Sequence, residues 1–350
     1  MTNIIEKIES EMPDELVATT QETAARVLLL GGVGAARCGD FSLGEALGKA
    51  LSEHDLLGSA LHRADINAAA WLEQTKIDVV SLAAMQAGRL DEVRAALGEA
   101  KTIGAGETEA LANAPHICFV NGIRLGFLAY SERRVGDFDG RADLLGLAVY
   151  DHVRMLLSQC DHVIVLVHAG LEGGELPLPE WRARYRRLID AGASAVVDTG
   201  ATKGWEAYKQ GLIFYGLGDP TNGAALALSL TLLQNGELRY EAFALGCADE
   251  EIDFSSDEAQ KQCINEQNEL FLDPAAYLGA VNRMCLRYYE EHDPLRRHGI
   301  LEAILSAKGE AARREEETRL IDVLADESRR YTLLRAFALK QGAKQQGGHI

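Results

Sequence analysis

The sequence predicts an α/β protein in which a largely parallel or mixed sheet is flanked by helices. Short β-branched apolar runs alternate with longer helical patterns over the first 250 residues. Beyond about residue 250 the β signal stops, and the chain becomes charged and helical. The length of 350 residues suits one large α/β domain with appendages, or two domains.

The apolar runs place the strands, and the segments with helical periodicity place the helices between them. We expect strands at residues 27–30, 78–82, 116–120, 125–130, 162–167, 195–197, 212–215 and 225–233. We expect helices at 42–52, 65–74, 90–100, 145–158 and 179–191. The dipeptide Asn121-Gly122 predicts a β-hairpin between 118–120 and 125–130, because Asn-Gly supplies the positive φ angles of a tight turn.

Composition and periodicity divide the chain into three parts. Residues 1–26 are acidic and helix-like, and they lack the basic and apolar regions of a secretory signal. The α/β domain is expected over 27–250, followed by a helical C-terminal extension over 251–350. The extension carries an amphipathic pattern with apolar residues at 320, 324, 331, 334 and 338, which is typical of a packing appendage or an oligomer arm.

Composition narrows the function classes. The formal net charge of -18 opposes binding to nucleic acid and to anionic membranes. No apolar run approaches the length of about 18 residues that a membrane span needs. The six cysteines are scattered without a C-x-x-C pair, which favours buried free thiols and a reducing compartment, so we expect a cytoplasmic protein.

Ligands of open α/β sheets sit beyond the carboxyl ends of the strands, so the residues after each strand are the candidates. After the first strand, Gly32 and Gly34 begin a G-x-G-x-x-G pattern that Arg37 breaks, which favours a glycine turn for close helix packing over a dinucleotide site. The strand at 78–82 runs into small and apolar residues, among which only Gln86 is able to hydrogen-bond a substrate.

The strand at 162–167 delivers His168 to its carboxyl end, and Glu172 follows on a glycine-rich loop. A histidine there with a carboxylate in reach suits a general acid/base, a metal ligand or a polar pocket wall, although a lone histidine is usually structural. Asp161 and His162 are not candidates for the crevice, because they lie at the opposite end of the strand.

The strand at 195–197 ends in Asp198 and a Thr/Gly/Lys loop that contains Lys203. Asp198 is a candidate for the same crevice as His168. An Asx turn or a helix N-cap is an equally good role for it.

In order, these segments resemble the poly-gamma-glutamate capsule-synthesis (CapA-type) family over residues 27–233. The segments that carry the resemblance are DVVSLA (78–83), IGAGETEA (103–110), VNGIRLGFLAYSE (120–132), HAGLEGGELP (168–177), LIDAGASAVV (188–197) and GLIFYGLGDP (211–220), which contains Asp219. The resemblance implies a metallophosphatase-like (calcineurin-like) layered sheet and helix domain.

This chain departs from the family pattern where the family has ligand-type side chains. Where the family has Gly-Asp, this chain has Gly31-Gly32. Where the family has Leu-Ala-Asn-Asn-His, residues 82–86 are LAAMQ, and where it has Gly-His-His-Pro-His, residues 198–202 are DTGAT. The family's His-Trp-Gly-x-Glu-Tyr keeps its His and Glu, at 168 and 172. Its Asn-Leu-Glu segment has no clear place, since the candidate at 71–73 fits a helix better.

His168, Glu172 and Asp198 are too few to hold two ions and marginal for one. We therefore expect no metal or other cofactor, or at most one weakly bound divalent ion (Mn, Zn or Mg). Gln86, Asp198, Lys203 and Asp219 are the predicted substrate-binding residues, and His168 with Glu172 is the predicted catalytic pair.

Three hypotheses follow. The leading one is a pseudoenzyme, a CapA-like accessory or binding component in the biosynthesis of a capsule, poly-gamma-glutamate or a peptide-like metabolite. The alternative is a diverged hydrolase or transferase in which His168 is the acid/base, Glu172 or Asp198 orients it, and Lys203 or Arg37 neutralises an anionic substrate. The third is a structural role as a homo-oligomer through the C-terminal helices. The expected partners are a small-molecule or peptide-like ligand and a biosynthetic protein.

Overall fold

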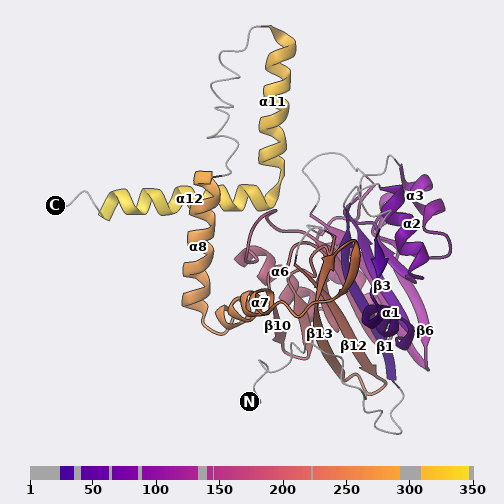
Figure 1. The fold of residues 1–350 in the computed structure, drawn as a ribbon. Helices are drawn as coiled ribbons and strands as arrows, with labels where there is room; N and C mark the ends of the chain where they lie inside the picture. Colours follow the sequence, from indigo (N-terminus) through magenta and orange to yellow (C-terminus); the bar gives the residue numbers. More distant parts are fainter. Residues whose placement is uncertain are drawn as a thin grey trace.

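Two β-sheets lie face to face, with helices on their outer faces, in the computed structural model (Figure 1). The structure describes residues 24–34, 41–62, 65–85, 89–132, 140–144, 146–221, 224–291 and 309–346. Between the sheets, apolar side chains from both of them form one buried cluster that includes Leu29, Phe127, Leu166 and Leu228. Burial of this apolar surface holds the two sheets together.

The first sheet has eight strands and mixed direction. In spatial order they are β2 (Ser42–Leu43), β14 (Glu251–Phe254), β13 (Leu238–Ala248), β12 (Ala225–Leu233), β1 (Ala24–Val33), β3 (Leu56–Leu61), β4 (Val79–Ser81) and β5 (Lys101–Ile103). The strands β1, β3, β4 and β5 are parallel, whereas β12 pairs antiparallel with β1. The carboxyl ends of the four parallel strands therefore meet at one edge.

The second sheet has six strands. In spatial order they are β10 (Trp205–Tyr208), β11 (Gly211–Phe214), β9 (Ala195–Asp198), β8 (His162–His168), β7 (Ile123–Ser131) and β6 (His116–Val120). The strands β7, β8, β9 and β11 are parallel. The predicted hairpin is confirmed, because β6 pairs antiparallel with β7 and both Asn121 (φ 48°) and Gly122 (φ 83°) have positive φ angles.

Helices cover both outer faces. The helices α1 (Glu45–Glu53), α2 (Ile66–Gln74) and α3 (Leu90–Ala96) share a buried cluster with the first sheet. The helices α4 (Glu109–Ala112), α5 (Ala148–Leu157) and α6 (Pro179–Asp190) share another with the second sheet. The C-terminal helices are α7 (Glu258–Leu270), α8 (Pro274–Glu291), α11 (Glu310–Ala325) and α12 (Glu327–Gln346). In Figure 1, α8 and α12 cross beside the α6 side of the domain, and α11 projects away from it.

The predicted fold class, a layered α/β domain with C-terminal helices, is confirmed. Several details were wrong. Residues 24–26, expected in an N-terminal helix, begin β1, and residues 1–23 lie outside the described part. The β structure continues past 250, because 251–254 forms β14, and β2, β3, β5, β10 and β13 were not predicted. Residues 42–43 form β2 rather than the first turn of a helix, and α3 ends at Ala96.

The cysteine prediction holds in part. The described cysteines are free thiols, and Cys160 and Cys285 are buried. However, Cys247 and Cys263 are exposed, contrary to expectation, and Cys38 lies outside the described residues. Within the described part of the chain, no helix combines the length and the apolarity that crossing a membrane would require.

Candidate functional site

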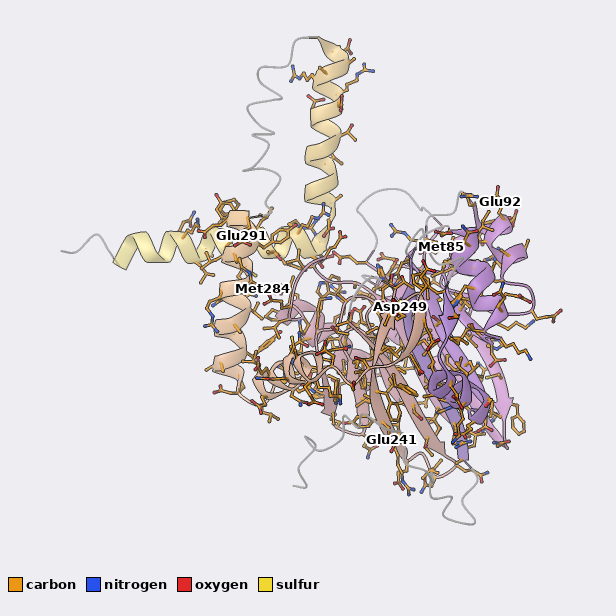
Figure 2. All side chains as sticks on the ribbon, viewed as in Figure 1. Met85, Glu92, Glu241, Asp249, Met284 and Glu291 are labelled. Carbon is orange, nitrogen blue, oxygen red and sulfur yellow. The ribbon has the colours of Figure 1, made fainter. Side chains whose placement is uncertain are left out.

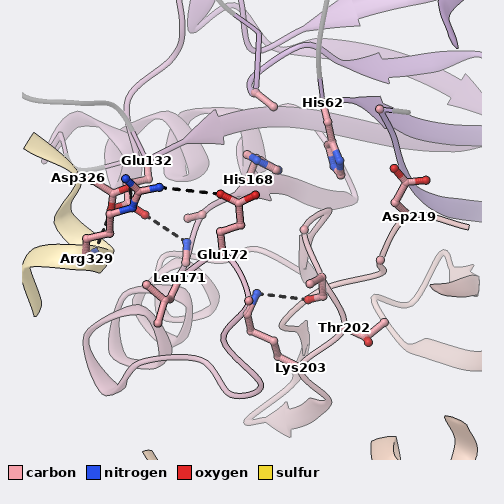
Figure 3. Close-up of a pocket in the computed structure, with 18 of the residues that line it drawn as sticks. His62, Glu132, His168, Leu171, Glu172, Thr202, Lys203, Asp219, Asp326 and Arg329 are labelled. Atoms are coloured by element: carbon pink, nitrogen blue, oxygen red, sulfur yellow. Dashed lines mark hydrogen bonds and ion pairs between the residues drawn. The ribbon is translucent and has the colours of Figure 1, made fainter. Parts of the chain in front are cut away.

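A crevice of about 670 Å³ opens where the parallel strands of both sheets end. Its walls include His62, which follows β3, Glu132, which follows β7, and His168, which ends β8. Figure 3 shows His62 and His168 facing Thr202 and Lys203 across it, with Asp219 at one end and Asp326 and Arg329 at the other. This is the place that α/β topology assigns to ligands.

The two histidines touch each other, with ring centroids 4.6 Å apart. Glycines make room for them, because a Cβ at Gly32 would lie 1.8 Å from Nε2 of His62. A Cβ at Gly31 would likewise lie 2.0 Å from the carbonyl oxygen of Gly218. The glycines thus serve close packing as expected, but they lie within β1 and adjoin His62 and a loop rather than a helix. Arg37 lies outside the described residues.

His168 is held as a neutral imidazole. Burial lowers its pKa well below the usual value, and the neighbouring charges of His62, Lys203 and Arg141 lower it further. Its Nδ1 lies 3.5 Å from the Thr199 hydroxyl. A neutral ring of this kind donates or accepts hydrogen bonds but is a weak general base at neutral pH.

Lys203 lines the crevice although its residue is only 4% exposed. Its ammonium donates to the carbonyl oxygen of Ala201 at 3.3 Å. Burial lowers its pKa, whereas the nearby carboxylates of Asp198 and Glu132 act to raise it. The lysine therefore places a positive charge, poorly shielded by solvent, in the wall of the crevice.

The Asp198 carboxylate is engaged in hydrogen bonds within the protein. Its carboxylate accepts a hydrogen bond from the Tyr185 hydroxyl at 2.5 Å and one from the Gly200 amide at 2.8 Å. Burial raises its pKa to about 6. The Gly200 bond is the Asx turn that the sequence allowed, and Asp198 is not among the residues that line the crevice.

Glu172 lies at the crevice, as expected, but it does not orient His168. No hydrogen bond joins these two side chains in the described structure, and the Glu172 side chain is 90% exposed. Its carboxylate lies 3.9 Å from the guanidinium of Arg329, which belongs to α12. The catalytic pair predicted from the sequence is therefore not a hydrogen-bonded pair in this structure.

Of the predicted substrate-binding residues, the crevice brings together Lys203 and Asp219, while Gln86 lies outside the described residues. One Asp219 oxygen accepts hydrogen bonds from the amide of Thr221 at 2.9 Å and from its hydroxyl at 2.6 Å. Asp219 thus forms its own local turn at the end of the crevice opposite α12 (Figure 3).

Sequence reasoning missed His62, Glu132, Arg141 and Arg329, which all line the crevice. His62 follows residues 56–61, which form β3, but this run contains a glycine and an alanine and no β-branched residue, so its strand signal was weak. Glu132, in contrast, follows a predicted strand and so was open to the argument from strand ends. No sequence signal pointed to Arg329, because its position at the crevice depends on how α12, which is distant in the sequence, docks on the domain.

The family pattern implies a metal centre, and the described residues do not fit one. Among them, no three His, Cys, Asp or Glu side chains converge in a way that would hold an ion. The room that an aspartate would need at position 32 is filled by the His62 ring. The positive charges of Lys203 and Arg141 lower the pKa of His168, and the same charges would repel a cation bound beside it.

A comparison with protein-family models agrees with the resemblance in the sequence. A family model described as "Bacterial capsule synthesis protein PGA_cap" matches residues 40–224. A hypothetical protein from Thermus thermophilus is 18% identical, with a TM-score of 0.45, over 63% of this chain and 98% of that one. A structure titled a novel phosphatase from Mycoplasma pneumoniae is 10% identical, with a TM-score of 0.47, over 69% of this chain and 98% of that one. Among curated proteins, no match is found.

Proposed function

The chain belongs to the bacterial capsule synthesis protein family PGA_cap, and from this premise we propose that it is an accessory component of capsule synthesis that binds an anionic, peptide-like ligand in its crevice. A polymer of γ-linked glutamate, or a metabolite with the same amide and carboxylate groups, has this chemistry. In this role the crevice recognises its ligand without a two-metal hydrolytic centre.

The observation that carries the proposal is the set of basic side chains, Lys203, Arg141 and Arg329, around the crevice. Of the four acidic side chains that share the walls in the described structure, Glu172 and Asp326 pair with Arg329, and the other two have donors outside the basic set. Glu132 accepts hydrogen bonds from Ser328, and Asp219 accepts them from Thr221. The basic groups are therefore the better candidates to meet a ligand, and a buried ammonium such as that of Lys203 gains strongly from a carboxylate partner.

One observation favours the alternative, a diverged hydrolase or transferase. The imidazole rings of His62 and His168 are in contact within the crevice, so two groups of the type used in acid/base catalysis lie side by side where a substrate would bind. The alternative requires that His168→Ala abolish turnover of a γ-linked peptide substrate. Turnover that persists in this variant would remove the alternative.

The proposal is tested by binding and by elemental analysis of the protein as purified. We expect a γ-linked glutamate hexamer to bind in calorimetry, and Lys203→Gln to weaken that binding by about tenfold or more, as the loss of a hydrogen bond to a charged group does. Lys209→Gln is the matched control, because Lys209 is exposed and pairs with Asp190 on α6.

The metal arm of the test is independent of the ligand. We expect substoichiometric metal in the purified protein, and little change in melting temperature on titration with manganese, zinc or magnesium. Stoichiometric, tightly bound metal with a clear rise in melting temperature would contradict the proposal. At most one weakly bound divalent ion is compatible with it.

Three further expectations complete the proposal. They are a cytoplasmic location, a biosynthetic protein as partner, and assembly of copies through the C-terminal helices. The acidic composition and the free thiols support the first. The projection of α11 away from the domain supports an arm that meets another protein (Figure 1).

A further inference from the structure

The C-terminal helix α12 reaches the crevice with its first turn. Ser328 is 1% exposed, and it donates from its amide and its hydroxyl to the Glu132 carboxylate, at 2.5 and 2.6 Å. The indole of Trp181 donates to the same hydroxyl at 2.6 Å. Leu333 and Ala336, further along α12, are also buried. These contacts dock the beginning of the helix at the carboxyl ends of the second sheet.

This docking carries Arg329 to the crevice. Its guanidinium pairs with Asp326, one turn back, at 3.4 Å, and with Glu172 from the opposite wall at 3.9 Å. The Arg329 side chain keeps 26% of its surface exposed, so it is open to the crevice. Figure 3 shows the Glu172 carboxylate directed across the crevice toward Arg329.

We infer that Arg329 is a specificity-determining residue, which binds a carboxylate of the ligand at the position that Glu172 takes in the free protein. The inference rests on the proposed function and adds the C-terminal extension to the binding site. Glu172 then acts as an internal competitor, rather than as a member of a catalytic pair.

The geometry allows the exchange. An exposed ion pair at 3.9 Å contributes only about 0–1 kcal/mol, so a ligand carboxylate with closer contacts displaces it. Glu172 lies between Gly170 (φ 99°) and Gly173 (φ 73°), and nothing lies within 4 Å of a Cβ built at Gly173. Glycines with positive φ let this loop change direction without side-chain clashes. Arg329, in contrast, is fixed by the docked helix.

The test measures the affinity of the full-length protein for a γ-linked glutamate hexamer and for the same hexamer with its α-carboxylates amidated. We expect Arg329→Gln to weaken binding of the charged hexamer by about tenfold or more and to change binding of the amidated hexamer much less. Arg329→Lys should restore part of the preference, because it keeps the charge but loses the two-pronged geometry.

Glu172→Gln should act in the opposite direction and strengthen binding of the charged hexamer by up to about fivefold, because it removes the competitor. Arg330→Gln and Glu175→Gln are matched controls, since these neighbours on the same helix and the same loop are not among the residues that line the crevice. Melting temperatures of all variants verify that they fold.

The two proposals fail in different ways. If the wild-type protein binds the charged hexamer, and Arg329→Gln binds it equally well or loses the same factor for both hexamers, the role of Arg329 is wrong and the proposed function stands. If Glu172→Gln binds the charged hexamer with unchanged affinity, Glu172 does not compete with the ligand for Arg329. If the wild-type protein binds neither hexamer, the proposed function and this inference are both wrong.

Discussion

Glu132 and Ser328 are 196 residues apart in the sequence and are joined by two hydrogen bonds. Glu132 follows β7 of the second sheet, and Ser328 lies in the first turn of α12. The same carboxylate accepts the amide of Gly170 at 3.2 Å, in the loop that carries Glu172. One half-buried carboxylate therefore connects the α/β domain, the glycine-rich loop and the C-terminal helix. Figure 2 shows α12 crossing α8 as it leaves this point.

This connection predicts the effect of Ser328→Ala. The change removes a hydroxyl donor from Glu132 and an acceptor from the Trp181 indole, both in the interior. Glu132 keeps the amide donors of Ser328 and Gly170, but the buried Trp181 indole loses its partner. Leaving such a group unpaired costs about 1–3 kcal/mol, so the free energy of unfolding should fall by about that much in urea denaturation. Ser158→Ala, at an exposed position that ends α5, should change it by less than about 0.5 kcal/mol. Equal effects of the two substitutions would contradict the docking role of Ser328.

Glu132 also predicts a pH dependence of stability. Burial and the nearby charge of Asp326 raise its pKa to about 7, against hydrogen bonds from Ser328 and Gly170 that act to lower it. A raised pKa means that the folded state holds the proton more tightly than the unfolded state. The resulting stability is present at low pH and is lost as pH rises through about 7.

Glu132→Gln isolates this contribution, because glutamine resembles the protonated acid and does not titrate. We expect the wild-type free energy of unfolding, relative to the variant, to fall by up to about 3 kcal/mol between pH 4.5 and pH 8. Urea denaturation of both proteins across this range measures the difference. A difference that stays flat with pH would show that Glu132 does not titrate in this window.

The α/β class was open to sequence reasoning, whereas several strands were not. The run at 162–168 is rich in valine and fully buried up to His168, so its pattern was clear. The run at 56–61, LLGSAL, lacks β-branched residues and contains glycine and alanine, both of which are depleted in strands. Residues 251–254 carry two acids in four positions. They form β14 because β13 and β2 pair with them, and this is tertiary context that local propensity does not contain.

The site was predictable to the same extent as the strands. His168, Lys203 and Asp219 follow predicted strands and do line the crevice. Missing β3 meant missing His62. The roles of Glu172 and Asp198 depended on partners that lie far away in the sequence or across the sheet, namely Arg329 for the first and Tyr185 for the second. Sequence spacing gives the edge of a sheet at which a residue lies, but not which side chain it faces.

The ion pairs around Glu206, which is not among the residues that line the crevice, predict one large effect on stability. Its carboxylate accepts bonds from Arg182 and Arg186 and from the Tyr215 hydroxyl. Burial opposes the charge, but these donors outweigh it and hold the Glu206 pKa at about 2. Glu206→Gln leaves Arg182, whose side chain is 10% exposed, short of its counter-charge, so we expect a loss of about 3–5 kcal/mol in urea denaturation. Glu237→Gln, in an exposed pair with Arg239, should cost less than about 0.5 kcal/mol, and a similar loss in both variants would contradict the argument.

The close approach of Gly32 to His62 leads to the final prediction. It concerns position 32, where this chain has glycine and the family pattern has aspartate. A Cβ at position 32 would lie 1.8 Å from Nε2 of His62, so the ring must move in Gly32→Ala. Overpacking of this kind costs about 1–3 kcal/mol, and it also disturbs the His168 ring that His62 contacts.

His62→Ala removes the ring and leaves a cavity, so it should also destabilise the protein when made alone. In the double variant the three atoms nearest to the new Cβ at position 32, all in the His62 ring, are gone, and we expect the loss to be smaller than the sum of the two single losses by about 1 kcal/mol or more. Urea denaturation of the four proteins in this cycle gives the coupling energy. Additive losses would mean that the two positions do not compete for the same volume, and the His62 ring would then not explain why position 32 lacks the family's aspartate.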